Sequence, residues 1–546
     1  MGSEIMDSKM HFSSRRSPVL GMRGMVAASQ PLAVAAGLEA LQIGGNAADA
    51  AVAAAAMLNL TQPTSTGIGG DCFALFYESA TKKVFALNGS GRAPSALTLD
   101  LVKSEGLENG IPPLHPFAIT VPGACAGWCD LIERFGRLDR ARVLGPAIRL
   151  AESGFPVTPL TAHTWKTFYE PQLSRSPNGR ELSINGRAPN AGEVFRNPGL
   201  ARTLRTVAEG GKEAYYKGEI AEAMVTVVRE AGGCLGLEDL ASHTSTWESP
   251  LSTTYRDYRI WECPPNGQGL TALMGLNILE GYDLAGTPPL SAERLHLEIE
   301  ALRLAFADTR WHVADPKFHA APVEGLLSKE YARERRRLLD PEKAAGTLSR
   351  GSPASSSDTV YLSVVDGEGN ACSFINSNYK GFGTGIVPRG WGFPLHNRGL
   401  NFSLDPAHPN CLAPGKRPYH TIIPGMITLG EDLFASFGLI GGFMQPQGHL
   451  QLVVSLIDDK ADVQAALDLP RFCIMAEESG GRVALEEGIP VRVMAALAEM
   501  GHPVVPVSGY GRSLFGRGHI IVRDRESGVL RDGSEPRADG CAMCLI

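Results

Sequence analysis

The stretch SSSDTVYLSVVD, residues 355–366, joins a loop of small residues to an apolar, β-branched segment that favours a strand. Upstream, residues 346–357 are rich in Gly, Ser, Pro and Ala without apolar periodicity, which predicts an exposed loop. Downstream, the turn 367–370 leads to a second predicted strand over 371–376. One hydroxyl residue, Thr359, stands where the loop meets the strand.

A hydroxyl at such a junction can attack the carbonyl carbon just before it. If the Thr359 hydroxyl attacks the carbonyl of Asp358, the peptide rearranges to an ester, and hydrolysis of that ester leaves Thr359 with a free α-amine. This amine has a reference pKa of about 7.7–8.0, so it can act as the base for the hydroxyl of the same residue. An ordinary loop that enters an edge strand has the same local pattern, and only distant residues can decide between the two interpretations.

Composition excludes several partners. The 546-residue chain is 44% hydrophobic and 20% charged, as is typical of a globular protein. A net charge of -7 and a pI near 6.0 offer no basic surface for nucleic acid or an anionic membrane. Residues 1–20 mix charges and serines, which predicts a disordered leader and neither a signal peptide nor an anchor. Ten scattered cysteines without zinc spacing fit reduced thiols, and we expect a cytoplasmic protein.

The remaining patterns mix helices and strands, which favours a layered sandwich of both. A short strand over 24–29 precedes two helices, and the second, 46–60, is almost wholly apolar and is predicted to be buried. Further strands are predicted at 72–77, 84–88, 255–262, 422–429, 434–440, 482–486 and 518–523, and further helices at 124–135, 140–153, 200–210, 218–231, 237–242, 270–279, 292–312, 329–339, 447–457 and 490–501.

Two glycines lie between a predicted strand and a predicted helix. Gly441 and Gly442 follow the strand 434–440 and precede the helix 447–457. Successive backbone N–H groups near a helix N-terminus are suited to stabilise the oxyanion of acyl transfer. A plain strand-to-helix turn has the same spacing, so the residues alone leave both interpretations open.

Several separated blocks match one family. They are residues 24–70, with Gly-Asn-Ala-Ala-Asp-Ala at 45–50 and Thr-Gly-Ile-Gly-Gly at 66–70, then 121–123, 358–366, 382–385, 416–418, 441–442 and 533–537. On these blocks, which extend over about Gly21 to Gly540, the chain resembles the gamma-glutamyltransferase (glutathione hydrolase) family of N-terminal nucleophile hydrolases. Within it, the chain resembles the divergent branch of oxamate amidohydrolase-like members.

The resemblance implies an α+β fold, a four-layer αββα sandwich made as one precursor. Cleavage between Asp358 and Thr359 would give a large fragment, 21–358 after the leader 1–20, and a small fragment, 359–546, in one intertwined body. The resemblance assigns the nucleophile to Thr359, the oxyanion site to Gly441 and Gly442, and the residue that steadies the nucleophile's amine to Ser377. It implies amide hydrolysis through an acyl-enzyme, with transfer to an amine as an alternative, and no metal or organic cofactor.

The chain departs from glutathione-cleaving members where the γ-glutamyl group is bound. Ser90 occupies the position of their carboxylate-binding Arg, and the chain's own cation, Arg92, directly precedes Ala-Pro at 93–94. Asn401 replaces the acid that binds the α-amine, and a neutral amide cannot neutralise an ammonium group.

Three further positions near these also differ. Arg398 occupies a nearby position at which the glutathione-cleaving members have an amide side chain. His420 and Thr421 replace the two serines that follow Lys-Arg-Pro-x in those members. Tyr379, in the polar cluster 376–379, is a further candidate for substrate contact.

Two enzymatic interpretations and one other follow. In the first, the protein is a glutathione hydrolase or gamma-glutamyltransferase in which Arg92 binds the carboxylate. In the second, it is an amidohydrolase similar to oxamate amidohydrolase or cephalosporin acylase, and Arg398 or Arg92 binds an acyl carboxylate without an α-amine. The third is a non-catalytic scaffold.

The expected partners are a small amide and the other fragment of the same precursor, with no nucleic acid or membrane. The physiological substrate and the oligomeric state, homodimer included, stay open.

Overall fold

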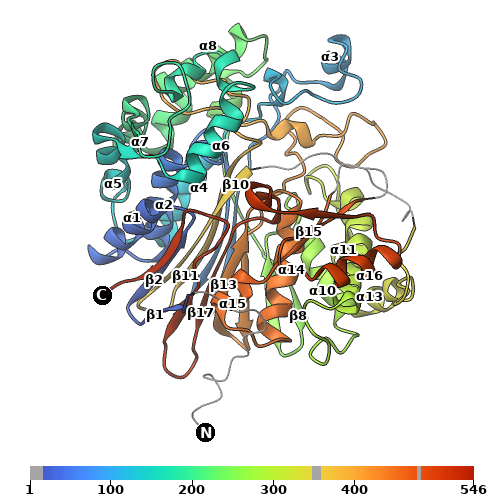
Figure 1. Cartoon of the computed structure of the whole chain (residues 1–546). Helices are drawn as coiled ribbons and strands as arrows, with labels where there is room; N and C mark the ends of the chain where they lie inside the picture. The colour runs from blue at the N-terminus through green and yellow to red at the C-terminus, as the bar shows by residue number, and fades with distance from the viewer. Residues whose placement is uncertain (1–15, 347–357, 476–480) are drawn as a thin grey trace.

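Two seven-stranded antiparallel sheets pack face to face, with helices on both outer sides (Figure 1). The computed structural model describes residues 16–346, 358–475 and 481–546. One sheet has the order β19 (Cys541–Cys544), β2 (Gly24–Ala28), β10 (Asp358–Asp366), β11 (Ala371–Tyr379), β3 (Asp71–Glu78), β4 (Lys83–Gly89) and β7 (Thr246–Glu248). The other has the order β1 (Val19–Gly21), β18 (Leu530–Asp532), β17 (Gly518–Arg523), β13 (Asp432–Leu439), β12 (Gly425–Leu429), β9 (Tyr258–Glu262) and β8 (Leu251–Tyr255).

Each sheet has its own helical layer. The sheet of β10 shares a core with helices α1 (Pro31–Gln42), α2 (Ala47–Thr61), α4 (Ala124–Phe135), α5 (Arg140–Ser153), α7 (Pro198–Lys217) and α8 (Glu219–Glu230). The sheet of β13 shares a core with α10 (Gly269–Leu279), α11 (Ala292–His312) and α14 (Met444–Ile457). A third core, which includes Phe73, Tyr361 and Met426, fills the space between the sheets. These layers confirm the predicted αββα sandwich.

Smaller elements complete the described chain. The shorter helices are α3 (Leu99–Ser104), α6 (Pro159–Tyr169), α9 (Leu237–Ala241), α12 (Val323–Leu326), α13 (Lys329–Arg336), α15 (Val463–Asp468) and α16 (Val491–Glu499). A small three-stranded sheet consists of β14 (Phe472–Ile474), β15 (Val483–Glu486) and β16 (Val504–Val507). A two-stranded sheet consists of β5 (Phe155–Pro156) and β6 (Val194–Phe195).

Helix α2 holds β10 from one side. Its first turn carries a capping box, because the Asn46 side chain accepts the N–H of Asp49 at 3.3 Å and the Asp49 side chain accepts the N–H of Asn46 at 3.0 Å. Every residue of the helix is buried, as its apolar sequence predicts. The N–H of Ala47 donates to the Asp366 carboxylate at 3.1 Å, which fixes the end of β10 to the start of this helix.

Several predicted elements have different bounds in the structure. The strand predicted over 255–262 contains the last residue of β8, a turn at Arg256 with a φ of 54°, and the whole of β9, so it is part of a hairpin. Since no glycine marks this turn, the sequence carries no signal for it. Helix α7 extends past its predicted end and kinks at Gly211. Val19 and Leu20, which the sequence analysis placed in the leader, belong to β1, and residues 1–15 lie outside the described part.

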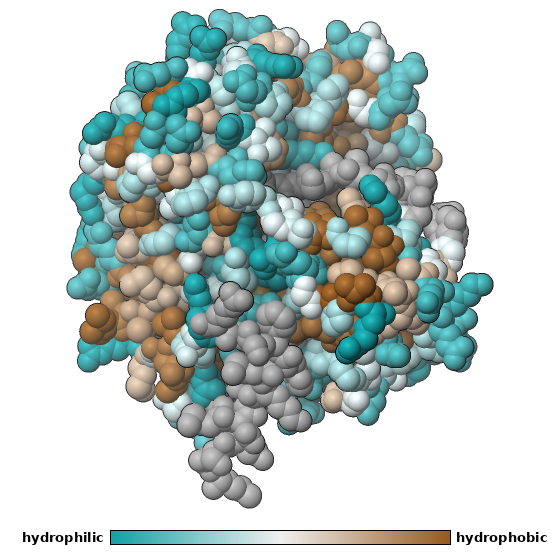
Figure 2. Space-filling model, in the orientation of Figure 1, coloured by the Kyte–Doolittle hydropathy of each residue, from teal (hydrophilic) through white to brown (hydrophobic). Residues whose placement is uncertain are grey.

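The outer surface has the mixed character of a globular protein. Figure 2 shows hydrophobic and hydrophilic residues interspersed over the visible face. In the described ranges, none of the helices combines the length and the apolar character that crossing a bilayer requires.

Candidate active site

The predicted nucleophile, Thr359, is the second residue of β10 and is fully buried. The register of β10 and β11 shifts by one residue at this point, so that Thr359 alone faces both Ser377 and Asn378. Two residues opposite one is the arrangement of a β-bulge, which redirects side chains locally. The hydroxyl oxygens of Thr359 and Ser377 lie 3.1 Å apart, within hydrogen-bond distance. The structure therefore brings together the two hydroxyl residues that the resemblance selected.

Tyr379 ends β11 in an unusual conformation. Its φ of 78° is rare for an aromatic residue and costs conformational energy. Its N–H donates to the Ser377 hydroxyl at 2.9 Å, and its own hydroxyl donates to the Asn401 side chain at 2.5 Å. The guanidinium of Arg398 lies over its ring, 4.3 Å from the centroid. Tyr379 thus connects the hydroxyl pair to two of the predicted substrate-binding residues.

The paired glycines form the turn between β13 and α14, as predicted. Gly441 has a φ of 119° and Gly442 a φ of 61°, which is the left-handed region that favours glycine. Helix α14 begins two residues later, at Met444. Within the described residues, the N–H groups of Gly441 and Gly442 donate to no other group. Two unpaired donors beside a helix N-terminus are suited to bind a developing oxyanion.

The packing of the two sheets directs this turn toward the start of β10. The Ser363 hydroxyl of β10 donates to the Ser436 hydroxyl of β13 at 2.7 Å. Two residues along, the ring of Tyr361 covers Gly438 so closely that a Cβ at this glycine would lie 2.4 Å from it. Side chains of a strand alternate between its faces, so we expect Thr359 to face β13 as Tyr361 and Ser363 do, toward the glycine turn that follows this strand.

A buried ionic cluster adjoins the hydroxyl pair on its other side. Asp71, the first residue of β3, is the cross-strand partner of Ser377 and is fully buried. One of its carboxylate oxygens lies 3.0 Å from Nε2 of His420 and 3.1 Å from Nδ1 of His396. Its other oxygen accepts the N–H of Gly91 at 3.0 Å and that of Gly123 at 3.4 Å. Both oxygens of this carboxylate are therefore occupied.

The surroundings of Asp71 keep its carboxyl group ionised. Burial alone would raise the pKa of the Asp71 carboxyl, but His396 and His420 outweigh it and hold that pKa well below its usual range. Burial, with the nearby charge of Arg398, lowers the pKa of His420 to about 3. At neutral pH, His420 is therefore uncharged and donates its Nε2–H to an ionised Asp71.

Arg398 carries the positive charge of this cluster. Its side chain is fully buried, its Nη1 donates to the Thr421 hydroxyl at 2.9 Å, and its Nε lies 3.7 Å from the Asp71 carboxylate. Burial lowers its pKa to about 10, against the opposing effects of Asp71 and Tyr379, so it stays protonated at neutral pH. Its Nε and Nη2 have no hydrogen-bond acceptor among the described residues. A buried guanidinium with unused donors is suited to bind a carboxylate.

The structure groups most of the predicted substrate-binding residues and separates one. Arg398, His420, Thr421, Tyr379 and Asn401 form one connected set. The Asn401 amide also donates to a backbone carbonyl, that of residue 419, at 3.0 Å, so both ends of this side chain are fixed. Arg92, in contrast, is only half-buried, and its Nη1 donates to a backbone carbonyl, that of residue 244, at 3.4 Å.

One residue that the sequence analysis missed connects this set to the glycine turn. Gln268, just before α10, is fully buried. Its side-chain amide donates to the carbonyl of Gly442 at 2.8 Å and to that of Thr421 at 2.6 Å. Its side-chain oxygen accepts the hydroxyl of Tyr419 at 3.1 Å. Gln268 therefore fixes the proposed oxyanion turn relative to the substrate-binding set.

Asp71 and His396 were missed as well, although Asp71 had a signal. A carboxylate stands at the start of the strand 71–78, directly after the Gly-rich loop and before the apolar run 72–77. A buried acid at the start of a strand calls for a cationic or hydrogen-bonding partner. The partners lie more than 300 residues further along the chain, and no local pattern identifies them.

A cavity of about 1000 Å³ adjoins this site at Tyr379 and Asn401, and the buried Thr359 and Arg398 lie behind its lining. Tyr379, Asn401, Tyr419 and Phe443 line it, and Phe443 directly follows the paired glycines. Arg310 of α11 and Lys380 add positive charge to the wall, whereas its two acids, at positions 108 and 405, are exposed.

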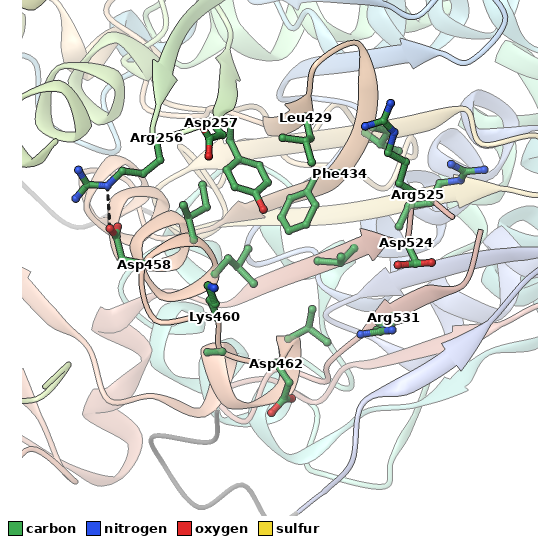
Figure 3. A pocket seen from close by; sticks show the side chains of 18 of the residues that line it. Arg256, Asp257, Leu429, Phe434, Asp458, Lys460, Asp462, Asp524, Arg525 and Arg531 are labelled. Atoms are coloured by element: carbon green, nitrogen blue, oxygen red, sulfur yellow. Dashed lines mark hydrogen bonds and ion pairs between the residues drawn. The ribbon is translucent and has the colours of Figure 1, made fainter. Parts of the chain in front are cut away.

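A larger cavity, of about 1430 Å³, lies elsewhere. Figure 3 shows Leu429 and Phe434 in its apolar part and the ion pair between Arg256 and Asp458, 3.0 Å long, at one side. Both acids and bases line it, and none of the predicted site residues is part of its lining. The smaller cavity, next to Tyr379, is therefore the candidate for substrate.

Comparisons with known proteins agree with this geometry. The family model for gamma-glutamyltranspeptidase matches residues 33–545. The chain is 37% identical over 532 residues to the glutathione hydrolase-like YwrD proenzyme of Bacillus subtilis (strain 168), covering 96% of this chain and 99% of the relative. It is 34% identical over 528 residues to the oxamate amidohydrolase proenzyme of Klebsiella pneumoniae, covering 95% and 98%.

A solved structure extends the likeness to the whole fold. The crystal structure of cephalosporin acylase from Bacillus halodurans superposes with a TM-score of 0.92 at 45% identity, covering 100% of this chain and 99% of that one. With its αββα sandwich and a threonine at the start of the central strand, the chain belongs to the gamma-glutamyltranspeptidase family of N-terminal nucleophile hydrolases.

Proposed function

We propose that this chain is a self-processing threonine amidohydrolase that cleaves amides whose acyl group carries a carboxylate and no α-amine. The observation that carries the proposal is the buried Arg398, whose Nε and Nη2 have no acceptor among the described residues. Beside it stands Asn401, a neutral residue fixed by Tyr379 and by a backbone carbonyl. The pair suits an acyl carboxylate and offers nothing to an ammonium group.

The only acid in contact with this set, among the described residues, is already engaged. Asp71 uses one carboxylate oxygen for two histidines and the other for two backbone N–H groups. A substrate ammonium would have to displace one of these buried partners, which would leave a polar group without a hydrogen bond. This cost favours acyl groups without an α-amine.

The reaction follows from the free end that processing would create. The α-amine of Thr359 accepts the hydroxyl proton while Oγ1 attacks the carbonyl carbon of the amide. The N–H groups of Gly441 and Gly442 would stabilise the oxyanion, and the amine of Thr359 returns the proton to the departing amine. Water then attacks the resulting ester, releases the carboxylic acid and restores the hydroxyl. Ser377, 3.1 Å from Thr359 Oγ1, would orient this pair.

Self-processing is tested with Thr359→Ala. The wild-type precursor is expected to separate into fragments 1–358 and 359–546, as proenzymes do, and the variant is expected to remain one chain of 58.2 kDa. The matched control is Ser363→Ala, which removes a buried hydroxyl from the same strand, four residues away. Intact mass measurement decides the matter, and two fragments from Thr359→Ala would refute the assignment.

Acyl specificity is tested with two anilides that differ in one group. Glutaryl-4-nitroanilide and γ-glutamyl-4-nitroanilide share the carboxylate and the scissile bond, and only the second carries an α-amine. We expect kcat/KM to be higher for the glutaryl substrate by about tenfold or more, the usual size of one lost charge-assisted contact. Equal or reversed values would contradict the proposal.

The second candidate is a glutathione hydrolase or gamma-glutamyltransferase. The YwrD relative from Bacillus subtilis, whose name describes it as glutathione hydrolase-like, favours this reading. The α-carboxylate of the γ-glutamyl substrate would then bind Arg92 or Arg398, and the α-amine of that substrate would need a partner other than Asn401. Cleavage of glutathione at a rate above that of the glutaryl anilide would establish it.

A further inference from the structure

Arg310 lines the cavity of about 1000 Å³ and forms no ion pair with a carboxylate of the described residues. It lies in the last turn of α11, a helix that covers the sheet opposite to the one that holds Thr359. Its guanidinium carbon lies 4.9 Å from the ring centroid of Phe306 and 5.4 Å from that of Phe443. Its Nε is buried and has no hydrogen-bond acceptor among the described residues.

The nearby acid on the same helix is used elsewhere. Asp308 accepts from Arg335 at 2.8 Å and from the hydroxyl of Tyr331 at 3.0 Å. The two acids of the cavity wall, Glu108 and Asp405, are exposed, and neither forms an ion pair with Arg310. Burial lowers the pKa of Arg310 to about 10, with Tyr419 acting in the opposite direction, so its charge persists at neutral pH.

The position of Arg310 differs from that of Arg398. Arg398, at the start of the 3-10 turn Arg398–Asn401, belongs to the fully buried cluster of Asp71, which pairs with Ser377 on the sheet of the nucleophile. Arg310 lies on the opposite side, against Phe443, which directly follows the glycines proposed to bind the oxyanion. An amide seated between the glycine turn and Thr359, with its acyl group at Arg398, would direct its amine portion into the remaining cavity, where Arg310 lies.

We propose that Arg310 forms a second carboxylate-binding subsite, which recognises an anionic group on the leaving amine of the substrate. The aromatic rings around it exclude water and strengthen its interaction with an anion, and a guanidinium can bind a carboxylate through two hydrogen bonds. The inference rests on the proposed amidohydrolase function. It narrows the substrate class to amides with one carboxylate on the acyl side and another on the amine side.

The test uses two substrates that differ only in the leaving amine. Glutaryl-4-nitroanilide and glutaryl-3-carboxy-4-nitroanilide are compared with the wild type, Arg310→Gln and Arg310→Lys. We expect Arg310→Gln to lower kcat/KM for the carboxylated anilide by about tenfold to a hundredfold, mainly through KM, and to leave the plain anilide within about threefold. Arg310→Lys should recover part of the loss, because it keeps the charge without the planar fork.

The control variant is Arg333→Gln, which removes the same charge from an exposed site on α13, outside the cavity. It should change neither substrate. Intact mass confirms that each variant is processed. Equal losses on both anilides with Arg310→Gln would overturn the subsite.

Two further measurements separate failure of the subsite from failure of the proposed acyl specificity. If the wild type prefers γ-glutamyl anilides, the acyl proposal fails, and the same comparison of leaving amines is made with the γ-glutamyl pair. Calorimetry with 5-amino-2-nitrobenzoate and 4-nitroaniline tests the subsite without turnover. Preferential binding of the carboxylated amine, lost in Arg310→Gln, supports the subsite, and equal binding of the two amines overturns it.

Discussion

Thr359 and Ser377 place their hydroxyl oxygens 3.1 Å apart across a β-bulge between β10 and β11. The same bulge sets the N–H of Tyr379 to donate to Ser377, so the Ser377 hydroxyl is held from one side while it faces Thr359 on the other. A hydroxyl oriented in this way can support both the attack that cleaves the precursor and the attack on substrate.

Ser377→Ala should slow both reactions. The variant loses one oriented hydroxyl without a change of fold, and one hydrogen bond is worth about 0.5–1.5 kcal/mol, which corresponds to roughly threefold to tenfold in rate. Ser377→Thr keeps the hydroxyl and should stay near the wild type. Gel densitometry follows the appearance of the fragments, and an anilide assay follows turnover. Unchanged rates in Ser377→Ala would show that the contact has no role in the chemistry.

Gln268→Met should lower kcat more than it raises KM. Met has a similar length but cannot donate to the carbonyls of Gly442 and Thr421, so the glycine turn loses its link to the substrate-binding set. Misplacing an oxyanion donor typically costs about a hundredfold, and a partial displacement is expected to cost about tenfold. Thr271→Val in α10, the helix that Gln268 directly precedes, removes a buried 2.8 Å contact away from the turn and is the matched control. A pure KM effect would exclude the positioning role.

Much of this site could be predicted because its signals are local. The strand that begins at Thr359 and the glycine pair after a buried strand are visible in short windows of sequence, and the structure has β10 and the glycine turn at those positions, whereas the loop predicted before Thr359 lies outside the described residues. The sequence itself marks Ser377 only as a member of the polar cluster 376–379, and the resemblance supplied its role beside the nucleophile. The hairpin at Arg256 was missed because a non-glycine residue adopts the positive φ of its turn.

The ionic cluster could not be predicted for a different reason. Asp71 meets His396 and His420 only because β3 lies beside β11 and the loops that carry both histidines cross the end of that pair. The bulge that aligns Thr359 with Ser377 is likewise a property of the strand pair and of neither strand alone. Gln268 directly precedes the apolar helix α10, but its three partners come from distant parts of the chain.

Asp71→Asn should destabilise the protein in a pH-dependent way. The pKa of Asp71 in the folded state lies well below its usual value, so the ionised carboxylate stabilises the fold above the pKa of the unfolded chain, about 3.9. That contribution is lost as the pH falls through the folded pKa. The difference in Tm between the wild type and Asp71→Asn should therefore be largest near neutrality and shrink below about pH 4.

The control for this measurement is Asp257→Asn, an exposed carboxylate in the β8–β9 turn. Its Tm should follow the wild type across the same range, because an exposed group contributes little. Thermal unfolding by circular dichroism from pH 3 to pH 8 gives both curves. A constant difference for Asp71→Asn at every pH would mean that packing, rather than charge, accounts for the loss.

Arg398→Gln should separate substrates by their acyl carboxylate. Glutaryl-4-nitroanilide and pentanoyl-4-nitroanilide have acyl chains of equal carbon count, and only the first ends in a carboxylate. Because the Nε and Nη2 of Arg398 have no acceptor among the described residues, we expect the variant to lose about tenfold to a hundredfold in kcat/KM on the glutaryl substrate. The pentanoyl substrate should change by less than about threefold. Since the variant also leaves Asp71 without its guanidinium, Tm and processing are measured alongside.

Arg92→Gln serves as the comparison, because the side chain of Arg92 lies outside the connected set. If Arg92→Gln, and not Arg398→Gln, discriminates between the two anilides, the acyl carboxylate binds at Arg92.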